Sequence, residues 1–321
     1  MNTIDSTNMK RVRGRVYLRQ HKAQERELRK AIKKFLLSQI RHVSSHIRST
    51  NSEITPQFLS VIYDTQEFHS QFKKTVTKHI ARGMIIGAMT EWTLFREFNN
   101  VPLDDILSNL ASDTDKESRV VVPKSQEELT VQQIMEIYEA TWKLEAAKTL
   151  GTVKSPLDAE MPRQIQQAIV QSLTATFLQP YWFGIAETTK ARLAAILLRG
   201  SMGKWTKEEV IQRINTTLGG KKASSRALSI ARTEMTNAFN AGHVAAIGVL
   251  EQAGYVNGRE WVSITDEATR FNHLNASGQV VNGREMFVVG GHTCRYPADY
   301  ALPPEERCYC RCTVTSVAQP T

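Results

Sequence analysis

Three cysteines alternate near the C-terminus, at Cys308, Cys310 and Cys312. Thiolates bind zinc, whereas reduced thiols also pack as small hydrophobic groups. If this segment is a strand, alternate residues point the same way and the three thiols share one face. Paired zinc ligands are normally separated by two to four residues, so three ligands at this spacing fit one ion poorly. A combination of Cys310 or Cys312 with a residue from elsewhere is geometrically freer.

Other metal-binding side chains lie close by in the sequence. The complete candidate metal set is His273, His292, Cys294, Cys308, Cys310 and Cys312. All four cysteines fall within the last 28 residues, whereas a secreted disulfide scaffold would spread them more widely. Three alternatives remain: a zinc site, a disulfide, or packed free thiols. We expect free thiols and no cofactor, with zinc as the alternative.

An acid–base cluster is a second chemical possibility. Asp266, Thr269, Arg270 and His273 follow a predicted strand, where they could exchange protons with a substrate. Asp also favours the cap of a turn, here one that starts at Glu267. A histidine beside Arg and Asp is more often a hydrogen-bonded part of the scaffold, which we favour.

A polar helix precedes these segments. Within the helix predicted over 224–253, the stripe Thr233, Glu234, Asn237 and Asn240 has helical spacing. Glu234 could act as a base or a ligand. We favour a structural role, in which Arg232 and Glu234 pair with loops of the sheet that follows.

Short segments rich in β-branched residues follow Gly254. They predict strands over 260–264, 279–281, 286–289 and 310–317, with a hairpin turn at Asn282-Gly283.

Helical periodicity covers most of the chain before this region. The predicted helices span about 25–47, 53–98, 129–150, 162–177, 187–198 and 207–218, with a polar linker over 99–125. Pro162 opens one helix, which Pro180 and Gly184 are predicted to break. Thr206 and Glu209 form a capping box, and Gly83 and Gly87 indicate close helix packing.

The positive charge is concentrated at the N-terminus. Residues 1–48 hold 13 Lys and Arg against 3 Asp and Glu, whereas the remainder holds 28 against 29. Residues 1–9 are expected to be irregular, and an amphipathic helix follows. Three interpretations of its basic face remain open: a surface exposed to solvent, a contact with DNA, or a contact with a membrane. The candidate DNA-binding residues are Arg11, Arg13, Arg15, Arg19, Lys22, Arg26, Arg29, Lys30, Lys33 and Lys34.

These patterns predict an α+β protein with a mostly helical N-terminal two-thirds and a small C-terminal α+β module that contains a short antiparallel sheet. The predicted domains are a basic helical arm over 1–52, a helical domain over 53–184 and the α+β module over 185–321. No membrane-length apolar run or signal peptide is visible in the sequence, so a cytoplasmic protein is expected.

The ordered motifs resemble the phage head morphogenesis family, which comprises the Mu F-type and SPP1-type minor head proteins. The resemblance covers roughly residues 185–315. It rests on Arg226, Arg232, Thr233, Glu234, Asn240, Trp261, Asp266, Thr269, Arg270, His273, Phe287, Pro297, Asp299, Cys310, Arg311 and Cys312. Two features depart from the family: Tyr309 stands where an Asn is usual, and the loop over 274–278 is longer.

The resemblance implies a virion component inside the head of a tailed phage, near the portal vertex, that assembles in the host cytoplasm. The implied partners are the portal protein, the major capsid or scaffold protein and packaged double-stranded DNA, with no membrane. The motif residues would then be structural, and no enzymatic activity is expected. The alternative is a metal-dependent nuclease or hydrolase that uses His273, Asp266, Glu234 and the C-terminal cysteines.

Overall fold

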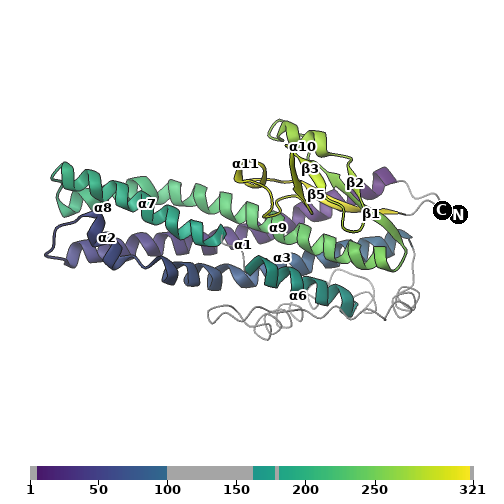
Figure 1. Cartoon of the computed structure of the whole chain (residues 1–321), viewed down its shortest axis with the longest axis horizontal. Coiled ribbons are helices and arrows are strands. Elements are labelled where there is room, and N and C mark those ends of the chain that lie inside the picture. The colour runs from purple at the N-terminus through teal and green to yellow at the C-terminus, as the bar shows by residue number, and fades with distance from the viewer. Residues whose placement is uncertain (1–5, 100–161, 178–180, 319–321) are drawn as a thin grey trace. The chain divides into compact units, whose positions relative to one another are not determined.

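The computed structural model describes residues 6–99, 162–177 and 181–318 (Figure 1). Its helices are α1 (Ser6–Ser49), α2 (Pro56–Ile62), α3 (Thr65–Asn99), α6 (Arg163–Phe177), α7 (Tyr181–Met202), α8 (Lys207–Leu218), α9 (Gly220–Gln252), α10 (Phe271–Ala276) and α11 (Pro304–Arg307). Its strands are β1 (Val256–Val262), β2 (Val280–Val281), β3 (Phe287–Val289), β4 (His292–Cys294) and β5 (Thr313–Ala318). The predicted α+β class is confirmed.

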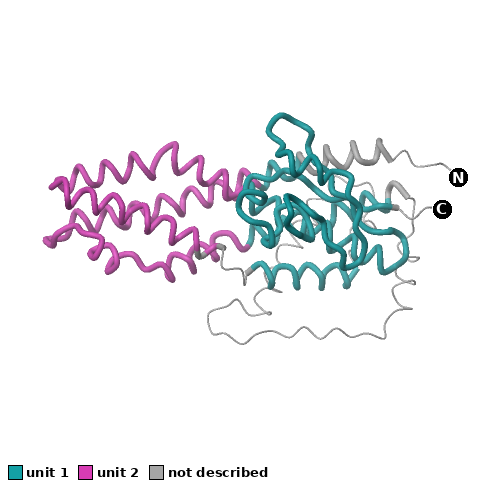
Figure 2. Tube along the Cα trace, turned by 45° about the horizontal axis from the view of Figure 1, so that its top comes forward, with its two compact units in different colours: residues 1–24, 78–178, 232–321 teal, residues 25–77, 179–231 magenta. Residues whose placement is uncertain are grey.

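The chain forms two compact units, coloured separately in Figure 2. Unit 1 comprises residues 1–24, 78–178 and 232–321, and unit 2 comprises residues 25–77 and 179–231. Helices α1, α3 and α9 each contribute residues to both units. The predicted division at residues 52 and 184 stays a prediction.

Unit 2 is helical, and the apolar face of α1 lies in its core. That face consists of Leu28, Ile32, Phe35, Leu36, Ile40, Val43 and Ile47, all of which are buried. The Phe35 ring lies 5.2 Å from that of Phe72, and the Tyr63 hydroxyl donates to the Ala186 carbonyl. The predicted amphipathic helix is therefore confirmed over this range, and it is part of a packed bundle. It also begins earlier than predicted, at Ser6.

Two predicted helix boundaries are wrong. The helix expected over 53–98 is interrupted at Tyr63 and Asp64, because the Asp64 carboxylate accepts hydrogen bonds from the first backbone N–H groups of α3. Gly184 lies within α7 and does not break it. A Cβ at Gly184 would meet no atom within 4 Å, so the glycine reflects no tight packing there.

Other helix ends follow the sequence. Thr206 and Glu209 form the predicted capping box at the start of α8, and Gly219 caps its end. Helix α6 begins directly after Pro162. The predictions over 100–161, which include the helix at 129–150 and most of the polar linker, lie outside the described residues. Among the described residues, no helix is long and apolar enough to span a membrane.

Helices α3 and α9 approach each other closely in unit 1. A Cβ added to Gly87 would lie 2.3 Å from the Phe239 carbonyl oxygen, and one added to Gly242 would lie 2.0 Å from that of Met84. Since these distances are far below van der Waals contact, the two backbones can meet only where side chains are absent. The prediction of close packing at Gly83 and Gly87 is confirmed.

The strands form two small antiparallel sheets, which lie over the C-terminal half of α9 with α10 and α11 (Figure 1). One sheet has the order β2-β1-β5, and the other is the hairpin of β3 and β4. The predicted turn at Asn282-Gly283 exists, but it does not join paired strands. The hairpin turn is at Gly290-Gly291, where both φ angles are positive. Strand β5 begins only at Thr313, so Cys310 and Cys312 precede it, contrary to the prediction.

Candidate functional site

The polar stripe of α9 holds the loop that leads into β5. The Asn240 amide nitrogen donates to the carbonyls of Pro297 and Cys312, at 3.2 and 3.0 Å, and its oxygen accepts from the backbone N–H of Val314 at 3.2 Å. The Asn237 amide donates to the Ala298 carbonyl at 2.9 Å. Because all of these groups are buried, the stripe provides hydrogen-bond partners that water cannot.

Threonines of α9 complete this contact. The Thr233 hydroxyl accepts from the backbone N–H of Tyr309 at 3.0 Å. The Thr236 hydroxyl donates its single proton to the Cys310 carbonyl at 2.9 Å. It must therefore accept in its second hydrogen bond, which joins it to Nε2 of His21 at 3.0 Å. Burial lowers the pKa of His21 to about 3, with Arg232 and Lys22 adding to the effect.

Glu234 and Arg232 meet tyrosines of the same loop region. The Tyr300 hydroxyl donates to Oε2 of Glu234, and burial raises the pKa of Tyr300 well above its usual value. The guanidinium of Arg232 lies 4.6 Å from the centre of the Tyr309 ring. Tyr309 has a φ of +67°, a conformation that Asn tolerates better than Tyr.

Arg226, the first residue of the motif, serves unit 2. Its guanidinium donates to the Thr189 hydroxyl and the Ile185 carbonyl, at 2.7 and 2.8 Å. These bonds connect α9 to α7.

Asp266 forms a bidentate ion pair with Arg311 on the surface. The two N···O distances are 2.6 and 2.5 Å, and Asp266 also accepts from Thr269 and from the Ala268 backbone, as the cap of a turn does. The hydrogen bonds from Arg311 are the main reason that the pKa of Asp266 is lowered to about 2. Asp266 is therefore a permanent anion at neutral pH.

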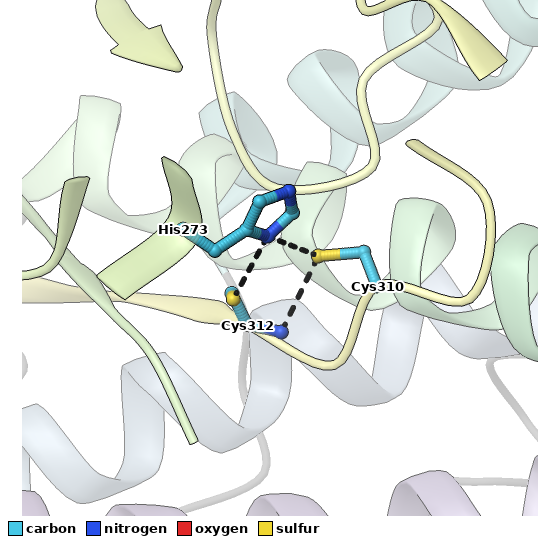
Figure 3. A group of neighbouring side chains, drawn as sticks. All are labelled: His273, Cys310 and Cys312. Carbon is cyan, nitrogen blue, oxygen red and sulfur yellow. Dashed lines mark hydrogen bonds between the residues drawn. The ribbon is translucent and has the colours of Figure 1, made fainter. Parts of the chain in front are cut away.

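Three predicted residues converge in the interior of unit 1 (Figure 3). Nδ1 of His273 lies 3.4 Å from the sulfur of Cys312 and 3.5 Å from that of Cys310. On the other side of the ring, Nε2 lies 3.1 Å from Oε2 of Glu306, which is buried. A carboxylate only accepts, so Nε2 carries the proton and the Nδ1 lone pair faces the two sulfurs.

The two thiols of this group differ in acidity. The hydrogen bond with Cys310 is the main reason that the pKa of Cys312 is lowered to about 5, and His273 and Ser263 add to the effect against the opposing influence of burial. Burial raises the pKa of Cys310 well above its usual value. The surroundings therefore favour a thiolate on Cys312.

The remaining metal candidates lie elsewhere. Cys308 follows α11, where its carbonyl accepts from the Arg270 guanidinium. Cys294 is buried in β4, and burial raises its pKa to about 12. His292 is exposed on the same strand. Within the part of the chain that the structure describes, the group of possible metal ligands contains only His273, Cys310 and Cys312. Cys294, Cys308 and His292 lie outside this group, as do Glu234 and Asp266.

Other motif residues shape the loop backbone. Asp299 accepts from the backbone N–H groups of Arg295 and Ala301, at 2.9 and 3.1 Å. Pro297 contributes its carbonyl to Asn240.

Sequence reasoning missed Glu306 and Arg259. Glu306 lies in the Pro-Pro-Glu-Glu segment, whose only visible signal is that of a helix start. Arg259 is buried on β1 and donates to the carbonyls of Arg295, Gly283 and Glu285. Its sequence neighbours, Gly258 and Glu260, give no signal that this arginine is buried.

Part of the candidate DNA-binding set forms a basic surface in unit 2. Lys30, Lys33, Lys34 and Arg41 line an open groove of about 410 Å³ with Leu37, Ile40 and Asn215. Lys22, Arg26 and Arg19 are also exposed on α1, and Arg29 is half-buried. Arg41 was not predicted, although it lies two helical turns after Lys34 on the same face. The side chains of Arg11, Arg13 and Arg15 lie outside the described residues.

Comparison with protein families finds a class of phage head proteins. Residues 189–315 match the family described as Phage Mu protein F like protein. This match confirms the predicted resemblance to the phage head morphogenesis family over residues 189–315. No curated protein gives a significant match. No solved structure does so either.

Proposed function

We propose that this chain is a minor head protein of a tailed bacteriophage that lies inside the head near the portal vertex, assists assembly and contacts packaged DNA without sequence preference. The observation that carries the proposal is the family match, which includes α8, α9 and the loop region bound to α9. The proposed partners are the portal protein, the major capsid or scaffold protein and double-stranded DNA. The protein would reach the virion from the host cytoplasm.

The motif residues support a structural role within this function. Asn237, Asn240 and Thr236 each donate a hydrogen bond to a backbone carbonyl of the loop region. Arg226 likewise donates to a backbone carbonyl of α7. A catalytic group needs a free path to its substrate. We therefore propose that the motif maintains the shape of the head protein and performs no reaction.

The basic groove supports the DNA contact. Lys30, Lys33, Lys34 and Arg41 place four positive charges along one side of α1, while the opposite side is buried in unit 2. Such an arrangement suits phosphate groups, since the contact is electrostatic and weakens as salt is added.

The metal-dependent nuclease or hydrolase is the second candidate, because His273, Cys310 and Cys312 could hold an ion. Glu234 and Asp266 are engaged by Tyr300 and Arg311, and neither joins that group. We expect no cleavage of plasmid DNA or RNA in the presence of Zn²⁺, Mg²⁺ or Mn²⁺. Cleavage that disappears in His273→Ala would favour the enzyme.

Co-expression with the portal protein of the same phage tests the proposed partner. We expect the two proteins to co-elute from affinity and size-exclusion columns. The control is co-expression with the tail-tube protein, which we expect to elute separately. Equal recovery with both proteins, or with neither, would contradict the portal contact.

A further inference from the structure

We propose that His273, Cys310 and Cys312 form a binding site for one zinc-class transition-metal ion, which links α10 to the loop before β5. The candidate ligand atoms are Nδ1 of His273 and the two sulfurs, and no two of them are more than 4.8 Å apart. All three residues are buried. The inference is independent of the proposed head function.

The two nitrogen–sulfur distances agree with the geometry of a tetrahedral zinc ion. Zinc lies about 2.3 Å from sulfur and about 2.0–2.1 Å from nitrogen. In a tetrahedron with these bonds, the nitrogen and each sulfur are about 3.5–3.6 Å apart. The observed separations are 3.4 and 3.5 Å. An ion can therefore be accommodated with little movement of the histidine against either thiol.

The backbone turn at Tyr309 makes this possible. The Cys-x-Cys spacing places ligands poorly on a regular strand, but Tyr309 has positive φ and β5 starts only after Cys312. The backbone N–H of Cys312 also donates to the sulfur of Cys310 at 3.4 Å, which holds that sulfur in place beside the histidine.

Glu306 supplies the partner that metal-bound histidines usually have. It accepts from Nε2 of His273, which directs the Nδ1 lone pair at the ion. Its other oxygen accepts from the Asn272 amide at 2.6 Å. A Cβ at Gly290 would lie 2.5 Å from the same oxygen, so the hairpin turn packs directly against this carboxylate. The outer partner is therefore itself fixed in position.

The fourth position faces a small cavity. This cavity of about 10 Å³ is lined by all three ligand residues and by Thr269, Arg270 and Arg311. Its size is that of about one water molecule, which would complete the tetrahedron. Binding requires both sulfurs as thiolates, so any thiol proton still present is released to solvent, and the two nearby arginines favour that change.

Metal analysis of the full chain tests the site. The protein is purified under reducing conditions, freed of metal, equilibrated with a small excess of Zn²⁺ and passed over a desalting column. We expect mass spectrometry to find close to one zinc per chain. We expect Co²⁺ in place of zinc to give the thiolate-to-cobalt absorption bands of a tetrahedral site.

Variants separate this site from adventitious binding. Cys310→Ser with Cys312→Ser should lose the zinc and the cobalt bands, whereas Cys294→Ser with Cys308→Ser should keep both. Glu306→Gln retains every ligand and should weaken zinc affinity about 10–100-fold. The Glu306→Gln variant covers the case in which the chain with Cys310→Ser and Cys312→Ser fails to fold. A folded wild-type chain that remains metal-free, or a folded Cys310→Ser, Cys312→Ser chain that binds zinc as the wild type does, would overturn the proposal.

Discussion

Asn240 is a buried side chain that holds several parts of the C-terminal region in place. Beyond its own helix it bonds to three backbone groups, those of Pro297, Cys312 and Val314. Asn240→Ala leaves these groups without partners, so we expect the free energy of unfolding to fall by about 2–4 kcal/mol. Urea denaturation measures the change. The exposed Asn275→Ala serves as control and should lie within about 0.5 kcal/mol of the wild type. Equal effects of the two variants would contradict the assigned role.

His21 makes stability depend on pH. Its folded pKa is about 3, below the ordinary value of 6.5, because burial disfavours the charged ring. Between these two values the unfolded chain binds the extra proton, so stability is present above pH 6.5 and is lost as the pH falls. The slope for one proton approaches about 1.4 kcal/mol per pH unit. In His21→Gln, which cannot gain this proton, we expect a shallower slope in denaturation measured from about pH 7 to about pH 4. An unchanged slope would show that His21 is not responsible.

The chemistry of single residues could be predicted only in part. The stripe of Asn237 and Asn240 follows from helical spacing, which is local. Its partners are loop carbonyls, whose positions depend on the tertiary fold. Tertiary structure also decides which residues lie beside His273. The sequence named six candidate metal ligands, and only the turn at Tyr309 shows that Cys310 and Cys312 are the two cysteines beside this histidine.

Among the elements, helices α3 and α9 depend on glycine for their close approach. In Gly87→Ala the new Cβ would lie 2.3 Å from the Phe239 carbonyl oxygen, so the helices must separate. We expect a loss of about 3 kcal/mol, at the upper end for an overpacked core. Gly248→Ala on α9 is the matched control, since its Cβ would meet nothing within 4 Å. It should gain about 0.5–1 kcal/mol from helix propensity. Thermal unfolding of both variants measures the difference, and two similar losses would exclude close packing as the cause.

Elements with strong local signals could be predicted well. The Thr206–Glu209 capping box and the buried face of α1 both occur where their patterns indicate. Gly184 shows the opposite case, because tertiary packing of α7 outweighs the helix-breaking tendency of one glycine. The strand boundaries were harder, since a positive φ at Tyr309 is set by packing against Arg232 and α9, and a tyrosine gives no signal of it.

At the scale of the whole molecule, the uneven charge leads to a prediction about DNA. Replacing Lys30, Lys33, Lys34 and Arg41 with Gln should weaken binding to duplex DNA at low salt. The slope of log K against log salt concentration should shrink by about 0.9 for each phosphate that the variant no longer neutralises. Substitution is preferable to deleting residues 1–48, because the deletion would remove part of the core of unit 2. Fluorescence anisotropy over a salt series measures both quantities.

The control for this prediction removes the same charge from other surfaces. Lys74, Lys78, Lys204 and Lys221 are exposed on other elements or turns, and their replacement with Gln should leave most of the salt dependence intact. Equal weakening in the two variants would mean that net charge, and not the groove on α1, governs DNA binding.

Location in the virion tests the central claim, a head protein near the portal, most directly. Purified phage particles and DNA-free heads would be analysed by mass spectrometry for this chain and reconstructed at the portal vertex without imposed symmetry. We predict that the chain is present in both and that density fitting unit 1 or unit 2 lies inside the head at the portal vertex. Particles that assemble normally and contain none of this chain would contradict the account.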